Sequence, residues 1–204
     1  MEERFCFGAL ILAAGRSSRM GKPKLLLPWG DTSILGHLLQ QWGRLNAQQI
    51  AVVCARGDQP ICAELDRLGF PAWDRIENPV PERGMFSSIQ CASLWCNWKQ
   101  SLTHWAFILG DQPHLRHETL NSVLECAVAQ SAKVVQPTHR GRRRHPVLLP
   151  KPIFLELQHS TACHLKEFLT RFEAVLVECD DPGLDLDLDR PEDYNKALAL
   201  APKK

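Results

Sequence analysis

Short apolar runs alternate along the chain with stretches in which apolar residues recur every three or four positions. The short runs are nearly continuous in Val, Ile, Leu and Phe, which is typical of strands that are covered on both faces of a sheet. They predict seven strands, at Phe7–Leu12, Ile50–Cys54, Phe70–Trp73, Trp105–Leu109, Val134–Gln136, Val147–Leu149 and Val175–Glu178.

The stretches between these strands predict helices. Asp31 is a suitable N-cap for a helix with Ile34, Leu38 and Trp42 on one face, and proline suits the first turn of a last helix at 191–200. Strand–helix alternation of this kind predicts an α/β fold with three layers, α/β/α, around a mostly parallel, Rossmann-like sheet of about seven strands. The remaining predicted helices are Gln59–Leu68, Ser87–Trp98, His117–Ser131 and Thr161–Phe172.

The composition is that of an ordinary globular domain, and 204 residues suit a single domain spanning 1–204. The 24 Lys and Arg against 23 Asp and Glu give a net charge of +1, which argues against a nucleic-acid partner. No apolar stretch approaches the ~20 residues that span a bilayer, so we expect no membrane association and a cytoplasmic protein. The eight cysteines form no C-x-x-C pair and are expected to be reduced, mostly buried side chains rather than zinc ligands.

The loop after the first predicted strand, LAAGRSSRMGKPK at 12–24, combines two glycines with several cations. It lacks the G-x-G-x-x-G fingerprint of dinucleotide sites, and Pro23 stands where a P-loop has its magnesium-binding hydroxyl. Gly15 allows close backbone approach to an anion, and the arginines and lysines offer charge for phosphates. A solvated basic turn explains the charges equally well, but the carboxyl end of a parallel strand is where such folds bind ligands.

Two acidic segments are candidates for holding a metal ion. The predicted strand 105–109 ends in GDQP, where Asp111 can reach a magnesium ion that also binds phosphate oxygens, although a plain turn is the alternative. In DLDLDRPED, alternation places Asp185, Asp187 and Asp189 on one face if the segment is a strand. Their mutual repulsion favours either a bound cation or solvent exposure.

Two further segments carry candidate substrate contacts. The segment 78–88 ends in Ser87 and Ser88, which can cap the following helix or contact a ligand. The run 139–147 is the most cationic in the chain. It suits a solvated loop or a nucleic-acid patch, but it lacks the interleaved aromatic residues of a single-stranded nucleic-acid site.

These motifs together resemble those of nucleotidyltransferases with a nucleotide-diphospho-sugar transferase fold, and most of all the molybdenum cofactor cytidylyltransferase group. The resemblance implies Arg19, Lys24 and Asp111 as catalytic residues, and Asp111 with Asp187 or Asp189 as ligands of Mg²⁺, with Mn²⁺ as an alternative ion. It implies that the nucleotide is bound by Leu12, Ala13, Ala14, Gly15, Arg16, Ser17, Arg19, Met20, Gly21, Lys24, Ser87, Ser88 and Asp111.

The same resemblance implies an acceptor site, but two positions depart from the family pattern. Arg190 replaces the usual threonine of the D-x-D-T-P-E-D segment, and Arg144 replaces a glycine of the G-x-x-G-H-P-V-like loop. The nucleotide-binding half is expected at about 1–115 and the acceptor-binding half at about 116–204. The implied acceptor-binding residues are Gln112, Pro113, Arg142, Arg143, His145 and Pro146.

The implied reaction is transfer of CMP from CTP to the phosphate of molybdopterin or its molybdenum form, with release of pyrophosphate and delivery of the product to a molybdoenzyme. Ala14 stands where guanylyltransferase relatives carry glycine, and its methyl group favours the smaller pyrimidine base. The alternatives are a GTP-dependent guanylyltransferase, another nucleoside triphosphate with a sugar or polyol phosphate, a cofactor-delivery protein without turnover, and an NAD(P)H reductase. The missing dinucleotide fingerprint argues against the reductase.

Overall fold

A central sheet with β1 (Phe7–Leu12) near its middle organises the computed structural model, which describes residues 4–15 and 23–201. The strand order is β10-β7-β9-β6-β1-β4-β5, with the short β8 paired to β7. Only β8 and β9 run antiparallel to their neighbours in this described sheet, so the prediction of a mostly parallel sheet is confirmed. The other strands are β4 (Gln49–Ala55), β5 (Arg75–Asn78), β6 (His104–Leu109), β7 (Val134–His139), β8 (Arg142–Arg143), β9 (Val147–Pro150) and β10 (Ala174–Glu178).

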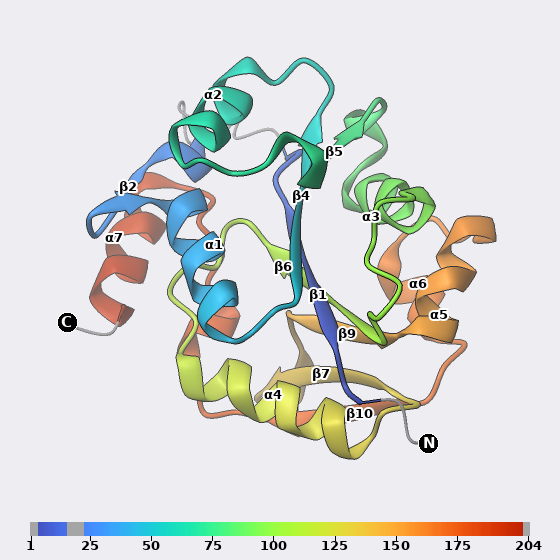
Figure 1. The fold of residues 1–204 in the computed structure, drawn as a ribbon. Helices are drawn as coiled ribbons and strands as arrows, with labels where there is room; N and C mark the ends of the chain where they lie inside the picture. The colour runs from blue at the N-terminus through green and yellow to red at the C-terminus, as the bar shows by residue number, and fades with distance from the viewer. Residues whose placement is uncertain (1–3, 16–22, 202–204) are drawn as a thin grey trace.

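Helices cover both faces of this sheet and complete the predicted three layers (Figure 1). Alternation along β1 sends Phe7, Ala9 and Ile11 into the core on one face and Leu10 into the core on the other. The first face packs against α1 (Ile34–Arg44), α2 (Gln59–Arg67), α4 (His117–Ala129) and α7 (Pro191–Leu200), and the second against α3 (Met85–Leu94), α5 (Lys151–Glu156) and α6 (Leu165–Leu169).

Several connections contain short elements that the apolar pattern did not predict. A two-stranded hairpin, β2 (Pro28–Trp29) with β3 (Thr32–Ser33), leads into α1. The rest are single turns of 3₁₀ helix, at η1 (Lys24–Leu26), η2 (Ala72–Asp74), η3 (Pro81–Arg83), η4 (Leu157–His159) and η5 (Pro182–Asp185).

The prediction of a strand at Phe70–Trp73 is wrong. Pro71 begins a 3₁₀ turn that leaves Trp73 exposed, and the strand of this region is β5, immediately afterwards. In β5 only Ile76 and Asn78 are buried, so a single apolar side chain marks it in the sequence. A short edge strand of this kind gives almost no hydrophobic signal.

Several predicted helix boundaries also need correction. Ser33 rather than Asp31 caps α1, because its side chain accepts a hydrogen bond from the Gly36 amide at 3.0 Å. The helix predicted at Ser87–Trp98 is α3, which begins two residues earlier at Met85 and ends at Leu94. The helix predicted at Thr161–Phe172 shrinks to α6, while α5, next to the buried β9, was not predicted.

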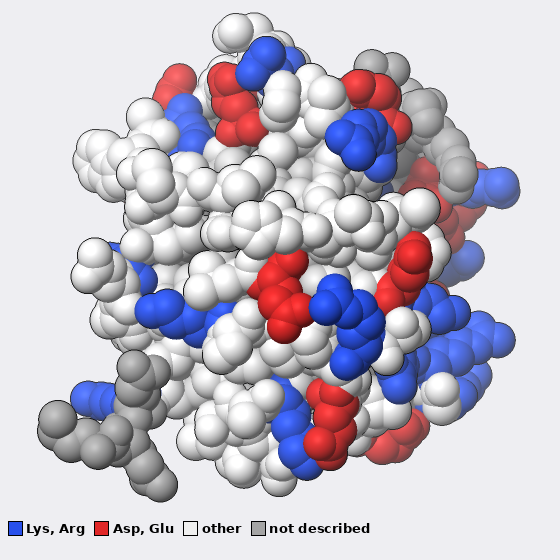
Figure 2. Space-filling model, turned by 90° about the vertical axis from the view of Figure 1, so that its right-hand side faces the viewer, with Lys and Arg blue, Asp and Glu red and all other residues white. Residues whose placement is uncertain are grey.

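The surface agrees with the balanced composition. Figure 2 shows one face on which acidic and basic side chains are mixed, with Lys and Arg gathered along one edge. In the described ranges, no helix is both long and apolar enough to cross a membrane. The expectation that most cysteines are buried is wrong, since only Cys54 and Cys179 are buried while Cys96 and Cys163 are exposed.

Candidate active site

The loops that follow β1 and β6 bring Lys24 and Asp111 into contact at the carboxyl edge of the sheet. The Lys24 Nζ donates a hydrogen bond of 2.6 Å to Asp111 Oδ2, and each side chain is less than one-fifth exposed. Asp189 extends this charge cluster, because its Oδ1 lies 3.8 Å from the same ammonium. Residues 87 positions apart in the chain thus form a charged centre, and the sequence predicted a role for each residue but not this contact.

Glycine at position 110 makes this approach possible. A Cβ atom there would lie 2.8 Å from a methyl group of Leu25 and 2.9 Å from the Leu12 carbonyl oxygen. Both distances are shorter than real Cβ contacts, and the Leu12 oxygen belongs to the backbone, so a larger residue at 110 would force the ends of β6 and β1 apart. The tight packing therefore keeps the residue before Asp111 against the end of β1 and against Leu25, the residue after Lys24.

Asp187 also lies near Asp111. Its Oδ1 accepts a hydrogen bond of 2.9 Å from Gln112 Nε2, and the Leu188 amide donates one of 3.3 Å to the Asp111 carbonyl. Desolvation raises the pKa of the Asp187 carboxyl above its usual value, and the charge of Asp111 raises it further. Much of Asp187 is nevertheless exposed, so solvent weakens this repulsion.

The prediction that Asp185, Asp187 and Asp189 share one face of a strand is wrong. Asp185 is the last residue of η5, and the residues after it form no strand. Its carboxylate turns away to His139, at 2.8 Å from Nδ1, and to Arg144. The hydrogen bond from His139, followed by that from Arg144, holds the pKa of Asp185 below its usual value. Asp185 is therefore occupied elsewhere, and only Asp187 and Asp189 lie near Lys24 and Asp111.

A pocket of about 410 Å³ opens beside Lys24 and Asp111. Its floor contains the end of β1, including the predicted nucleotide-binding residues Leu12, Ala13, Ala14 and Gly15. Of the facing wall only Ser88 was predicted individually, although the whole wall lies within the segment 78–88 that the sequence singled out. The wall residues are Pro81, Glu82, Gly84, Met85 and Ser88.

Ser87 and Ser88 do not cap α3, because Gly84 occupies the N-cap position and the serines lie inside the first turn. Both are buried, and their hydroxyl oxygens accept hydrogen bonds of 2.8 and 2.9 Å from Asn78 Nδ2. Ser88 lines the pocket, whereas Ser87 donates to the Gly84 carbonyl at 2.8 Å. The pair fastens η3 and α3 to the end of β5 and so shapes the pocket wall.

The predicted acceptor residues fall into two groups. Arg142 and Arg143 are exposed on β8, which forms a hairpin with β7. Gln112, His145 and Pro146 instead surround a buried gap of about 10 Å³, too small for any ligand, and Pro113 is buried beside Gln112 in sequence. Burial lowers the pKa of His145, which lies 3.4 Å from the Phe107 carbonyl through Nδ1. The acceptor role of all six residues stays a prediction.

Part of the predicted phosphate loop lies outside the described residues, namely Arg16, Ser17, Arg19, Met20 and Gly21. Their predicted roles are therefore untested. The described flanks of the loop, Gly15 and Lys24, both line the same pocket, so the loop begins and ends there.

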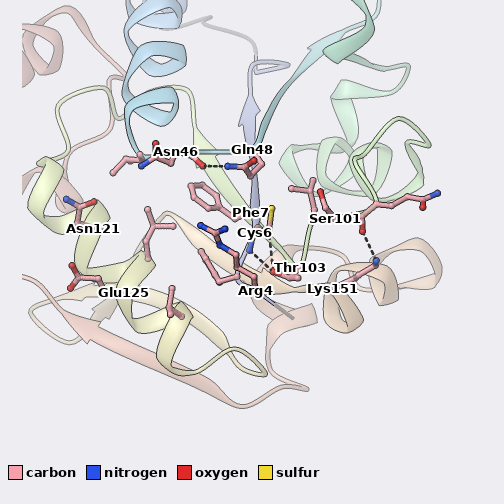
Figure 3. Close-up of a pocket in the computed structure, with 16 residues that line it drawn as sticks. Arg4, Cys6, Phe7, Asn46, Gln48, Ser101, Thr103, Asn121, Glu125 and Lys151 are labelled. Atoms are coloured by element: carbon pink, nitrogen blue, oxygen red, sulfur yellow. Dashed lines mark hydrogen bonds between the residues drawn. The ribbon is translucent and has the colours of Figure 1, made fainter. Parts of the chain in front are cut away.

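A larger cavity, of about 850 Å³, lies at the opposite end of the sheet (Figure 3). Asn121 and Glu125 of α4 stand on one side of it and Lys151 on the other, with Arg4 and Phe7 between them. None of the described residues predicted for the active site lines this cavity.

Comparison with known proteins finds a family and a relative that each match most of the chain. Residues 9–186 match the family described as the MobA-like NTP transferase domain. The chain is 26% identical over 187 residues to the molybdenum cofactor cytidylyltransferase of Escherichia coli K12, covering 91% of this chain and 92% of that protein.

Two solved structures have a similar fold. One is Rv0371C of Mycobacterium tuberculosis H37Rv in complex with manganese, with a TM-score of 0.69 and 23% identity over 96% of this chain and 98% of that chain. The other is molybdopterin-guanine dinucleotide biosynthesis protein A of Archaeoglobus fulgidus, with a TM-score of 0.68 and 14% identity over 95% and 97% of the two chains. At these identities both show the fold alone.

Proposed function

We propose that this chain, which belongs to the MobA-like NTP transferase family and is a nucleotidyltransferase, transfers CMP from CTP to the terminal phosphate of a molybdopterin-type acceptor and releases pyrophosphate. The observation that carries the proposal is the contact of Lys24 with Asp111 beside a pocket floored by the end of β1. The cytidylyltransferase relative, which matches over nearly the whole chain, supports the choice of nucleotide and acceptor.

The pocket suits a nucleotide in size and polarity. About 410 Å³ lies within the range of small-molecule sites, and the apolar floor of Leu12 and Ala13 faces the polar pair Lys24 and Asp111. We place the base and sugar between the end of β1 and the wall of α3, and the phosphates toward Lys24. Arg19 is proposed to meet the same phosphates, as the family resemblance implies.

The donor set beside Lys24 fits a hard divalent cation. Asp111 and Asp187 offer carboxylate oxygens, which Mg²⁺ and Mn²⁺ prefer, and a bound cation would relieve the repulsion that raises the pKa of Asp187. We propose Asp111 and Asp187 as the ligands, because the charge of Asp111 acts on the Asp187 carboxyl and two hydrogen bonds join the segments that carry them. When bound, the ion supplies positive charge to the triphosphate. The manganese complex of the mycobacterial structure is consistent with this choice.

The chemistry requires positioning more than proton transfer. The attacking oxygen belongs to a phosphate that is already an anion, so the reaction needs no side-chain base. Lys24 is proposed to neutralise charge on the leaving pyrophosphate, since its ammonium is already fixed by Asp111 at the mouth of the pocket. The packing of Gly110 against Leu25 keeps this ammonium in place before the substrate binds.

Arg142 and Arg143 are proposed to bind the acceptor. They are exposed on a hairpin whose base is tied to Asp185, two residues before Asp187. Exposed guanidinium groups can hold a phosphate through two hydrogen bonds each. On this proposal residues up to about 115 serve the nucleotide and those from about 116 the acceptor.

The test is pyrophosphate release from CTP and from GTP, with molybdopterin and Mg²⁺ present. We expect CTP to give the larger kcat/KM, because Ala14 lines the pocket and narrows it against a purine. One methyl group discriminates by about 1–3 kcal/mol, or roughly 10- to 200-fold. The matched variant Ala14→Gly should reduce this preference without lowering turnover of CTP.

A preference of the unaltered protein for GTP would refute the cytidylyl assignment and leave the transferase class intact. A thermal-shift series with CTP, GTP, ATP and NADPH precedes this assay. Stabilisation by NADPH alone would overturn the transferase assignment itself.

A further inference from the structure

Two segments that carry the proposed metal ligands run side by side in opposite directions. One follows β6 and enters α4, at 111–119, and the other lies between β10 and α7, at 181–188. Residue numbers rise along the first segment as they fall along the second. Successive hydrogen bonds join them in this order: Leu188 N to Asp111 O at 3.3 Å, Gln112 Nε2 to Asp187 Oδ1 at 2.9 Å, His114 Nε2 to Gly183 O at 3.0 Å, and Arg116 N to Asp181 Oδ2 at 3.0 Å.

Asp181 fixes the far end of this pairing. The residue is 3% exposed, and its Oδ2 also accepts a hydrogen bond of 2.8 Å from the Thr119 hydroxyl. The other oxygen, Oδ1, accepts one of 2.9 Å from the Gly183 amide. Arg116 is the N-cap of α4 and forms no cap with its own side chain, so Asp181 caps this helix from a distant segment. A carboxylate at a helix N-terminus is favourable, and both of its oxygens are used.

His114 fills the space between Asp181 and the proposed metal ligands. It is 1% exposed, and its contact with the Gly183 carbonyl requires the proton on Nε2. A Cβ atom on residue 183 would lie 2.9 Å from both Asp181 Oδ1 and His114 Cδ2. The two segments are therefore packed so closely that only glycine fits at this point.

This packing has a clear consequence for Asp187. Residues 186–190 form no helix or strand, so they are held by the burial of Leu188 in the core and by hydrogen bonds to the segment that carries Asp111. Two neighbouring carboxylates repel each other before a cation is present, which would push a loosely held segment away. The two hydrogen bonds that buried Asp181 accepts from Arg116 and Thr119 oppose that displacement, and the bond from the Gly183 amide fixes Asp181 within its own segment.

We infer that Asp181 and His114 are positioning residues, which hold Asp187 against Asp111 in the arrangement that a metal ion and triphosphate require. This inference rests on the proposed function for its catalytic consequence. A positioning role differs from a role of Asp181 as a helix cap alone. It predicts that a change at Asp181 affects residues 185–189 and turnover.

The test uses the full chain with Asp181→Asn or Thr119→Val, and Asp58→Asn as the matched control. Asp58 caps α2 through a single 3.2 Å hydrogen bond from the Ile61 amide, and asparagine caps a helix nearly as well. In Asp181→Asn the NH₂ group would face either the Gly183 amide or the donors of Arg116 and Thr119. Two donors would then meet, so one hydrogen bond is lost. Thr119→Val removes a single donor and keeps the side-chain shape, should Asp181→Asn fail to fold.

Two readouts are measured. Hydrogen exchange of the protein without nucleotide or metal should become about tenfold faster in peptides covering 183–190 in both variants, and stay unchanged there in the control. Steady-state kinetics should show kcat lower by roughly 10- to 100-fold with the KM for CTP changed by less than about threefold, because small misplacement of reacting groups is costly.

Unchanged exchange at 183–190 together with unchanged kcat, with only a lower melting temperature, would overturn the inference and leave Asp181 as a helix cap. If the unaltered protein turns over no CTP, the proposed function fails, but the exchange measurement still decides whether Asp181 positions Asp187.

Discussion

The two ends of the central sheet differ in the chemistry that their cavities contain. At the carboxyl ends of β1 and β6, a pocket of about 410 Å³ contains Lys24 and Asp111 in direct contact. At the amino ends, a cavity of about 850 Å³ contains charged groups that stand apart, such as Glu125 and Lys151 (Figure 3). The Lys151 ammonium there binds only a main-chain carbonyl, that of Gln100 at 3.4 Å, among the described contacts. Volume alone therefore does not identify the site.

The difference follows from the direction of the strands. In a parallel sheet the loops that leave the carboxyl ends lie next to one another, so residues distant in sequence converge there. At the amino ends of β1 and β6, the polar contact joins a side chain to the main chain. The Thr103 hydroxyl accepts a hydrogen bond from the Cys6 amide and donates one to the Cys6 carbonyl. The contact at that end joins the two strands, whereas the Lys24–Asp111 contact joins two side chains that line a pocket.

The largest expected effect comes from Asp111→Asn, which removes a charge and keeps the side-chain size. We expect kcat for CTP to fall roughly 10²- to 10³-fold, about 3–4 kcal/mol, because Asp111 is proposed to hold the metal and to fix Lys24. Pyrophosphate release measures this, and circular dichroism checks that the fold is kept.

The matched control for this variant is Glu125→Gln, which removes one carboxylate from the cavity at the other end. Its activity should stay within twofold of the unaltered protein. Equal losses of activity in Asp111→Asn and Glu125→Gln would contradict the difference between the two ends of the sheet. They would point to a general effect of removing a negative charge.

An intermediate effect is expected when Arg142 and Arg143 are both changed to alanine. The KM for the acceptor should rise roughly tenfold per arginine, since a charge-assisted hydrogen bond contributes about 1.5–3 kcal/mol. The KM for CTP and the melting temperature should change little, because both side chains are exposed. Arg171→Ala, which removes another exposed arginine, is the control for non-specific charge effects. An unchanged acceptor KM would remove the β8 hairpin from the acceptor site.

The sequence predicted the layers of the fold because buried strands such as β1 and β6 are continuous apolar runs. It did not predict β5, where one apolar residue is buried, or β8, whose two residues are both arginines. Hydrophobic periodicity does not mark strands that are held by backbone pairing at an edge. The missed strands of the central sheet are accordingly short and polar.

For the candidate site, sequence order indicated which loops converge but not which side chains meet. The places of Asp111 after β6 and of Lys24 after β1 predicted that both lie at the same edge of the sheet, but their contact was not predicted. The alternation of three aspartates gave a wrong prediction for Asp185, because Pro182 and Gly183 begin a 3₁₀ turn instead of a strand. The buried carboxylate of Asp181 was also missed, since its partners lie more than 60 residues away in the sequence.

The smallest expected effect tests the cavity at the amino ends. The six residues of β1 separate the two ends by about 20 Å, at ~3.3 Å per residue, which is more than twice the screening length of about 8 Å at physiological salt. Asn121→Ala and Lys151→Ala should therefore leave kcat and the KM for CTP within twofold of the unaltered protein in the pyrophosphate-release assay. A tenfold loss in either, with an unchanged melting temperature, would show that the larger cavity takes part in turnover. Such a result would require coupling through the packed sheet, because direct electrostatic action does not reach that far.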